Sequence, residues 1–103
     1  MLAHEEAQKI FDKGAEAFHS QDYNRAHEEW ERAAKATNDA EAAYNLGLMY
    51  SNGTGVEKSY QKGHDWFLQA ADQDHAEAEY SLGVLYNMGF GVEADFAEAA
   101  YWY

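Results

Sequence analysis

The sequence predicts an all-α protein: a right-handed α-α superhelix, or solenoid, of three helical hairpins, the last of them truncated. Residues 40–67 and 76–103 align without gaps at a spacing of 36 residues, and 12 of the 28 aligned pairs are identical. Apolar residues in both stretches recur at helical rather than alternating spacing. Proline is absent, and alanine, glutamate and leucine are plentiful, which favours helices.

An N-terminal hairpin is predicted from two apolar stripes, each with the spacing of one helix face. The first stripe comprises Ala3, Ala7, Ile10, Gly14 and Ala17, and the second comprises Tyr23, Ala26, Trp30, Ala33 and Ala34. Only 12 residues separate Gly14 from Ala26, whereas the equivalent spacing is 16 in each later unit. We therefore expect a tighter turn in the first hairpin, with Asp22 as the helix cap.

The middle hairpin follows the same scheme. Its first helix is predicted from Ala42, Leu46, Met49 and Tyr50, and its second from Tyr60, Gly63, Phe67, Ala70 and Ala71. We expect Asn38, with Glu41 three residues later, to cap the first helix. Ser59 is the expected cap of the second helix.

The last hairpin repeats the first-helix stripe as Ala78, Leu82, Leu85 and Tyr86 and opens a second stripe with Phe96, Ala99 and Tyr103. Asp74 with Glu77, and Asp95 with Glu98, are the expected caps. The second stripe stops early, which suggests a fragment of a longer array. We expect the aromatic residues of the second helices to be core residues, namely Tyr23, Trp30, Tyr60, Phe67, Phe96 and Tyr103.

Glycines recur at two kinds of position. Those that follow a first helix are expected to turn the chain out of it through positive φ angles: Gly53, Gly55, Gly89 and Gly91. Gly47 and Gly83 lie inside predicted helices, where a residue without a side chain lets two helices pack closely.

Composition excludes several classes of function. Seven Lys and Arg against 19 Asp and Glu give a net charge of −12, which disfavours nucleic acids and anionic lipids as partners. The lack of cysteine excludes disulfides, thiolate metal sites and a cysteine nucleophile.

No segment approaches the length of about 20 apolar residues that a membrane-spanning helix needs. The first residues do not resemble a secretion signal, so we expect a cytoplasmic protein if Met1 is the native start.

No catalytic, cofactor or metal site is predicted. The segment from Gly53 to Ser59 is unlike a phosphate-binding loop, because no glycine precedes Lys58 and no apolar strand leads into it. No serine lies in a Gly-x-Ser-x-Gly elbow. The five histidines show neither an i, i+4 pair nor an acidic arrangement with metal-site spacing. We therefore expect a protein that is not an enzyme and needs no cofactor.

Particular motifs connect the chain to a known family. They are Ala-Glu-Ala-Ala-Tyr-Asn-Leu-Gly-Leu-Met-Tyr from Ala40, Asn-Gly-Thr-Gly-Val from Asn52, and Trp66-Phe67. Residues 39–103 resemble the Sel1-like repeat, a subclass of the tetratricopeptide repeat, and the N-terminal unit looks like an ordinary tetratricopeptide repeat. The proline that is frequent after the Gly-x-Gly-Val loop of the family is missing here.

The resemblance implies a binding surface, because the first helices of such repeats line the concave wall on which peptides usually lie. The matching positions are Phe11, Ala15, Phe18, Glu41, Tyr44, Leu48, Ser51, Glu77, Tyr80, Val84 and Asn87. They hold acids, aromatics and aliphatics, so a basic or apolar protein or peptide is the expected partner rather than an acidic C-terminus. Alternatively, Tyr44 and Tyr80 merely complete the packing between hairpins.

The expected organisation is one repeat domain over residues 1–103. It divides into a tetratricopeptide-like unit at 1–37, a Sel1-like unit at 38–73 and a partial Sel1-like unit at 74–103. The expected function is that of a protein-interaction scaffold or adaptor. The alternative is a structural spacer or self-assembling segment, with self-association through the incomplete C-terminal hairpin.

Overall fold

The computed structural model describes residues 4–103, which form six α-helices and no strand. The helices are α1 (His4–His19), α2 (Tyr23–Thr37), α3 (Ala40–Asn52), α4 (Tyr60–Ala71), α5 (Ala76–Met88) and α6 (Phe96–Trp102). Met1 and Ala3 lie outside the described range, and the side chains of His4 and Ala7 are not described either. No helix within residues 4–103 is long and apolar enough to cross a membrane.

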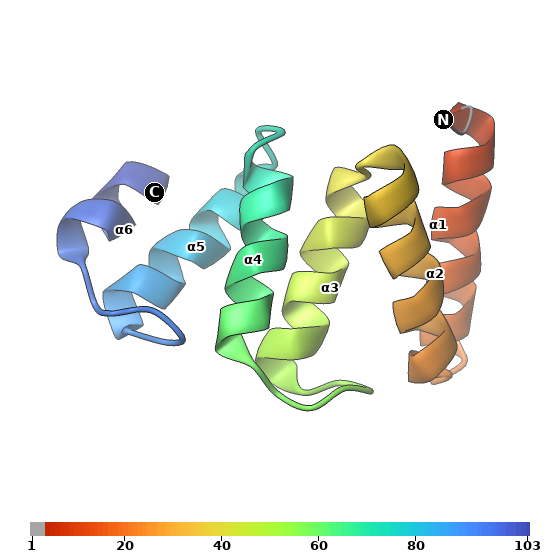
Figure 1. Cartoon of the computed structure of the whole chain (residues 1–103), viewed down its shortest axis with the longest axis horizontal. Helices are drawn as coiled ribbons and strands as arrows, with labels where there is room; N and C mark the ends of the chain where they lie inside the picture. Colours follow the sequence, from red (N-terminus) through yellow and green to blue (C-terminus); the bar gives the residue numbers. More distant parts are fainter. Residues whose placement is uncertain (1–3) are drawn as a thin grey trace.

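The helices stand side by side in a row that runs from α1 at one end to α6 at the other (Figure 1). Each helix packs against the next one in the chain, which makes three hairpins, α1–α2, α3–α4 and α5–α6. The molecule is elongated, with extents of 39 × 26 × 17 Å. The predicted all-α repeat architecture is thus confirmed.

Small residues dominate the core and let the helices approach one another. Alanines with no exposed surface lie in α2, α3, α4 and α5: Ala26, Ala33, Ala42, Ala43, Ala70 and Ala78. The largest fully buried side chains are Leu46, Met49 and Leu82. A core of this kind gains free energy mainly by removing apolar surface from water between closely spaced helices.

Each hairpin is closed by a glycine of the first helix that lies against an aromatic ring of the second. A methyl group added at Gly14 would be 2.4 Å from the Trp30 ring, and one at Gly47 would be 2.5 Å from Phe67. Gly83 lies against the ring of Tyr103, the residue that directly follows α6. The expectation that Gly47 and Gly83 permit close helix packing is confirmed, and Gly14 extends it to the first hairpin.

The loops after α3 and α5 return against the preceding hairpin. Gly53 and Gly89 end these helices with φ angles of 70° and 71°, as expected for left-handed C-caps. Two residues later, Gly55 lies against Tyr23 and Gly91 against Tyr60. A methyl group at either glycine would come within 2.7 Å of the tyrosine, so both loops require glycine for the contact as well as for the turn.

Two expected helix caps were wrong. Asn38 has a φ of 56° and ends α2, while Asp39 caps α3 by accepting a hydrogen bond from Ala42 N–H. Asp74 has a φ of 60°, and His75 caps α5 instead. Asparagine and aspartate tolerate the left-handed conformation better than most residues. Asn38 and Asp74 therefore each take the position directly before the residue that caps the next helix.

The other three expected caps are confirmed. The side chains of Asp22, Ser59 and Asp95 each accept a hydrogen bond from a backbone N–H in the first turn of their helices. These bonds satisfy donors that the helix itself leaves free.

The aromatic stripe of the second helices is buried at Trp30 and Phe67, half-buried at Tyr23 and Tyr60, and exposed in the third unit. Trp30 and Phe67 are 4% and 2% exposed, whereas Tyr103 is 62% exposed. Phe96 is 73% exposed. The expectation that Phe96 and Tyr103 are core residues was therefore wrong, because within residues 4–103 no later helix covers α6 as α3 covers α2.

Replacing Gly47 by alanine is expected to lower the free energy of unfolding by about 1–3 kcal/mol, because the new methyl overlaps the buried ring of Phe67. Gly83→Ala is the matched control. Its methyl meets Tyr103, whose exposed ring can swing into solvent, so stability should stay unchanged or rise by up to about 1 kcal/mol through helix propensity. Urea unfolding followed by circular dichroism measures both, and equal losses at the two positions would contradict this packing.

Candidate binding surface on α1, α3 and α5

A hollow lies between α1 and α3, on the surface formed by the first helices of the hairpins. Its volume is about 310 Å³. Its walls are mostly apolar, and the lining residues are Phe11, Ala15, Phe18, His19, Trp30, Asn45, Leu48, Met49, Asn52 and Thr54. The structure thus brings together four of the positions predicted for partner binding, from two different helices.

Trp30 supports the hollow from α2. Its indole N–H donates to the carbonyl of Phe11 at 3.2 Å. The Phe11 and Phe18 rings lie 5.9 and 5.5 Å from the Trp30 ring, tilted against it. Both phenylalanines therefore pack against a buried ring, and together they form an apolar wall of the hollow.

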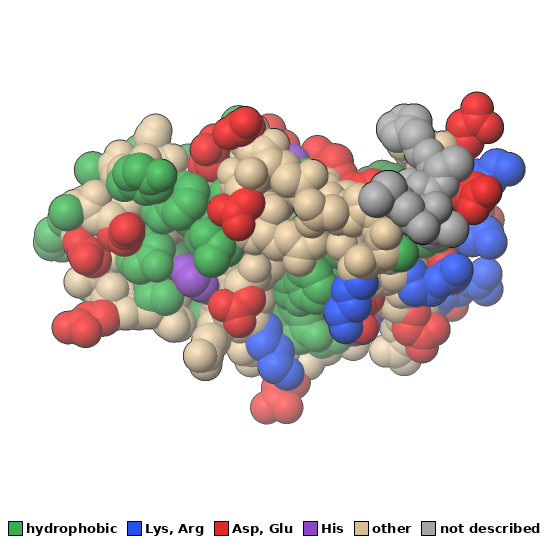
Figure 2. All heavy atoms as spheres, turned by 45° about the horizontal axis from the view of Figure 1, so that its top comes forward, with side chains coloured by type: hydrophobic (Ala, Val, Ile, Leu, Met, Phe, Trp, Pro, Cys, Tyr) green, Lys and Arg blue, Asp and Glu red, His purple; other side chains and the backbone are tan. Residues whose placement is uncertain are grey.

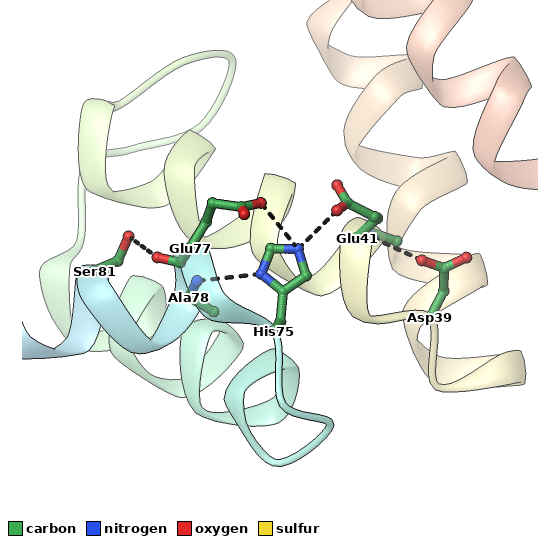
Figure 3. Close-up of polar contacts among 7 residues, drawn as sticks. Asp39, Glu41, His75, Glu77, Ala78 and Ser81 are labelled. Carbon is green, nitrogen blue, oxygen red and sulfur yellow. Dashed lines mark hydrogen bonds and ion pairs between the residues drawn. The ribbon is translucent and has the colours of Figure 1, made fainter. Parts of the chain in front are cut away.

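A second cluster lies where α3 meets the start of α5 (Figure 3). His75 Nε2 lies 2.8 Å from Glu41 Oε1 and 3.6 Å from Glu77 Oε2. The His75 ring also packs on Tyr44, with ring centres 4.8 Å apart. Three of the predicted binding positions, Glu41, Tyr44 and Glu77, are thus gathered around a histidine that the sequence analysis did not select.

The tautomer of the neutral His75 ring follows from its role as a helix cap. Its Nδ1 accepts a hydrogen bond from Ala78 N–H at 3.2 Å, so in the neutral ring the proton is on Nε2, which donates to Glu41. One nitrogen and two carboxylate oxygens within 4.8 Å of one another also have the make-up of a metal site. A cation on Nε2 would drive the proton to Nδ1 and break the cap, so this arrangement favours the capping role.

The sequence shows no acidic arrangement with metal-site spacing around a histidine, because Glu41 precedes His75 by 34 residues and only the fold joins them. A signal for His75 does exist in the sequence. Extending the alignment of residues 40–67 with 76–103 by one residue places Asp39 opposite His75, and both are helix caps.

The environment of Tyr44 raises the pKa of its phenol above the ordinary value of 10.0. Burial is the largest cause, and the negative charges of Glu77 and Glu41 add to it, while a hydrogen bond with Ser81 acts in the opposite direction. The phenol therefore stays protonated on this surface and can donate a hydrogen bond to a ligand.

The remaining predicted positions are less closely grouped. Tyr80 is 60% exposed and lies beside Tyr103, with ring centres 5.6 Å apart. Val84 is half-buried and Asn87 is exposed on the same helix. Ser51 faces away from the surface: its hydroxyl lies against Gly63 of α4 and is buried.

Charge is distributed unevenly along the row of helices. Residues 63–103 contain eight Asp and Glu and no Lys or Arg, whereas residues 1–62 hold all seven basic residues. In Figure 2 the Lys and Arg side chains gather toward the α1 end, and none is seen over α5 and α6. The cluster around Glu41 and Glu77 lies toward the acidic end of the molecule, so it attracts cations.

The family model for the Sel1 repeat matches the chain three times, at residues 7–38, 40–75 and 76–103. The first match covers the unit whose sequence looks like an ordinary tetratricopeptide repeat. None of the curated proteins compared with this sequence matches it.

The solved structures that are similar to this one include the following two. The first is c5321, a protective antigen present in uropathogenic Escherichia coli strains that displays an SLR fold, with a TM-score of 0.89 and 34% identity over 93% of this chain. The second is a Sel1 repeat protein from Oxalobacter formigenes, with a TM-score of 0.83 and 30% identity over 89% of this chain. The similarity covers 21% and 37% of those two chains, so both are much longer.

His75→Ala is expected to lower the free energy of unfolding by about 1 kcal/mol relative to His75→Asn, because asparagine retains a side-chain acceptor for the Ala78 N–H and alanine does not. Both variants lose the contact with Glu41, so the difference between their free energies of unfolding measures the contribution of the helix cap alone. Thermal unfolding of the two proteins measures it. Equal stability of the two variants would show that the Nδ1 bond contributes nothing.

Tyr44 is expected to make stability depend on alkaline pH. The folded protein holds the phenol proton more tightly than the unfolded chain does, so this contribution is complete below pH 10 and is lost as the pH rises through the raised pKa. Glu77→Gln should bring the pKa of Tyr44 closer to 10, whereas Glu28→Gln on α2 should not change it. NMR titration of the Tyr44 ring measures the pKa, and an equal effect of both variants would contradict the assignment.

Proposed function

Since the chain belongs to the Sel1 repeat family, we propose that it is a protein-interaction scaffold that holds a peptide or protein segment on the surface of α1, α3 and α5. Proteins built from these repeats generally serve as scaffolds for protein–protein interactions. The finer part of the proposal, the surface used and the chemistry of the ligand, is supported by the geometry of the hollow and of the acidic cluster.

The hollow between α1 and α3 is the observation that carries the proposal. It has an apolar wall in Phe11 and Phe18, and α3 contributes Leu48 from the opposite side. Interfaces gain most of their affinity from a few apolar or aromatic side chains that fill such pockets. With a volume of about 310 Å³, the hollow suits one large side chain of a ligand.

The acidic cluster adds a preference for charge. The side chains of Glu41 and Glu77 are 56% and 64% exposed, and His75 is the partner they share. A lysine or arginine of a ligand therefore meets two carboxylates that are already held in position, which gives specificity and a faster association.

The separation of the two sites sets the pattern of the ligand. Leu48 and Glu41 are seven residues apart on α3, which corresponds to about 10 Å along the helix axis. An extended peptide covers that distance in about three residues. The proposed ligand carries a large apolar side chain and, about three or four residues away, a lysine or arginine.

Selection from a library of displayed peptides tests this pattern. The enriched peptides should share the apolar residue and the basic residue at that spacing. The double variant Glu41→Gln, Glu77→Gln should then weaken binding of a selected peptide by about tenfold, equivalent to about 1.4 kcal/mol. Fluorescence anisotropy with the labelled peptide gives the affinities.

Two matched controls separate the surface from general effects of charge and packing. Glu28→Gln with Glu57→Gln removes the same charge from exposed positions on α2 and the α3–α4 loop and should leave affinity nearly unchanged. Leu48→Ala should weaken binding, while Leu68→Ala removes an equally half-buried leucine from α4 and should not. Enrichment of acidic peptides, or equal effects of the paired variants, would overturn the proposal.

A further inference from the structure

Two large apolar side chains are exposed where α5 ends. Met88 is the last residue of α5 and is 55% exposed, and Phe90 follows in the α5–α6 loop and is 37% exposed. The loops that follow α1, α3 and α5 lie along one edge of the molecule, the lower edge in Figure 1. The hollow is also found at this edge, because its lining includes the last residues of α1 and α3.

The middle unit shows which surface these two side chains share. Met88 is equivalent to Asn52, 36 residues earlier, and Phe90 is equivalent to Thr54 in the same way. Asn52 and Thr54 line the hollow from the α3 side, so the repeat places Met88 and Phe90 at the next junction, between α3 and α5. Asn52 is exposed and Thr54 half-buried although a further hairpin follows them. Accessibility at these positions is therefore a property of the surface of the first helices.

The apolar residues of the two junctions come from opposite sides. At the hollow, α1 supplies two phenylalanine rings, and the polar lining residues from α3 and its loop are Asn45, Asn52 and Thr54. The equivalent residues of α5 and its loop are Ser81, Met88 and Phe90, so two of the three polar positions have become large and apolar. Leu48 lines the hollow, and its equivalent on α5 is the half-buried Val84. Apolar side chains thus continue from the hollow across α3 to the end of α5.

Phe90 packs against the preceding hairpin. Its ring stacks on that of Tyr60 in α4, with ring centres 4.8 Å apart and an angle of 15° between the planes. The Lys58 ammonium group lies 4.7 Å from the centre of the same Tyr60 ring. A ring that already packs in the free protein loses less conformational freedom when a ligand binds. Phe90 is therefore suited to be an aromatic contact residue of an interface.

Charge defines the kind of partner that fits here. Met88 and Phe90 belong to the segment of residues 63–103, which contains eight Asp and Glu and no Lys or Arg. A basic segment is attracted to this part of the molecule, as it is to the cluster around Glu41 and Glu77. A second copy of this chain also carries a net charge of −12, so repulsion between like charges opposes it as the occupant.

We infer that Met88 and Phe90 form a second apolar subsite for the same ligand, an extended basic peptide that carries a second large apolar residue. This inference rests on the proposed function, because the first apolar residue stays in the hollow and the basic residue stays at Glu41. Three hairpins span 39 Å along the longest axis of the molecule, so neighbouring junctions are about 13 Å apart. An extended chain covers that distance in about four residues. The peptide runs along α3 from Glu41 to the hollow and then crosses the end of α3 to Phe90.

A second round of peptide selection tests this subsite. The core peptide from the first selection keeps its apolar and its basic residue, and about five randomised residues are added on each side. The enriched peptides should carry a second large apolar residue about three to five positions from the first, on the side away from the basic residue. Fluorescence anisotropy then gives the affinities of the core peptide and of the extended peptide.

Exchanging residues between the two junctions tests the side chains themselves. Met88→Asn with Phe90→Thr gives the end of α5 the residues that the same fold accommodates at the end of α3. The double variant should weaken the extended peptide by about tenfold and the core peptide by less than about twofold. Met88→Asn alone keeps the stack of Phe90 on Tyr60 and should weaken the extended peptide by about threefold. Tyr101→Ala is the matched control, since it removes an exposed aromatic residue from α6 and should change neither affinity.

The second subsite and the proposed function fail in different ways. If Leu48→Ala weakens the core peptide but no second apolar residue is enriched, only the second subsite is overturned. The same holds if the double variant weakens both peptides equally. If no core peptide is enriched, or if Leu48→Ala leaves its affinity unchanged, the proposed function and the second subsite are both overturned. Sedimentation of the chain as a dimer that the double variant dissociates would also overturn the subsite, since a second copy would then be the occupant.

Discussion

The contact between a glycine of the first helix and a buried aromatic ring of the second helix, made in the first two hairpins, is the constraint on which the rest of the structure depends. Gly14 against Trp30 and Gly47 against Phe67 bring the two backbones of a hairpin closer than any side chain at the glycine position would allow. Each ring then fills the space that the glycine leaves, and both rings belong to the same buried core as the alanines of these helices. Close packing of this kind tolerates little added volume.

The candidate binding surface follows from the same contact. Trp30 of α2 packs against Gly14 of α1. Its ring therefore also contacts Phe11 and Phe18, and these two residues form one wall of the hollow. The junction between hairpins then sets the second part of the surface, since His75 caps α5 and reaches back to Glu41 of α3. Packing inside a hairpin and capping between hairpins thus place apolar and acidic groups on one set of helices.

Much of the fold could be predicted from the sequence, because a repeat of 36 residues with helical apolar spacing admits few architectures. The glycine positions were predictable for the same reason. The caps of α3 and α5 were not, because a residue suited to capping precedes each true cap and takes the left-handed turn position instead. The exposure of Phe96 and Tyr103 could not be predicted from the spacing of apolar residues either. That spacing identifies the apolar face of a helix but not whether another element covers it.

The candidate site was predictable in part. The resemblance to the repeat family placed Phe11, Phe18 and Leu48 on one surface, whereas the cluster around His75 arises from residues far apart in the sequence.

The most direct test of the contact between glycine and aromatic ring is the chemical shift of the glycine Hα protons by NMR. The rings of Trp30 and Phe67 should shift the Hα signals of Gly14 and Gly47 strongly away from those of Gly53, which faces no ring. Ordinary helical shifts at Gly14 and Gly47 would contradict this account of the hairpins and of the surface they support.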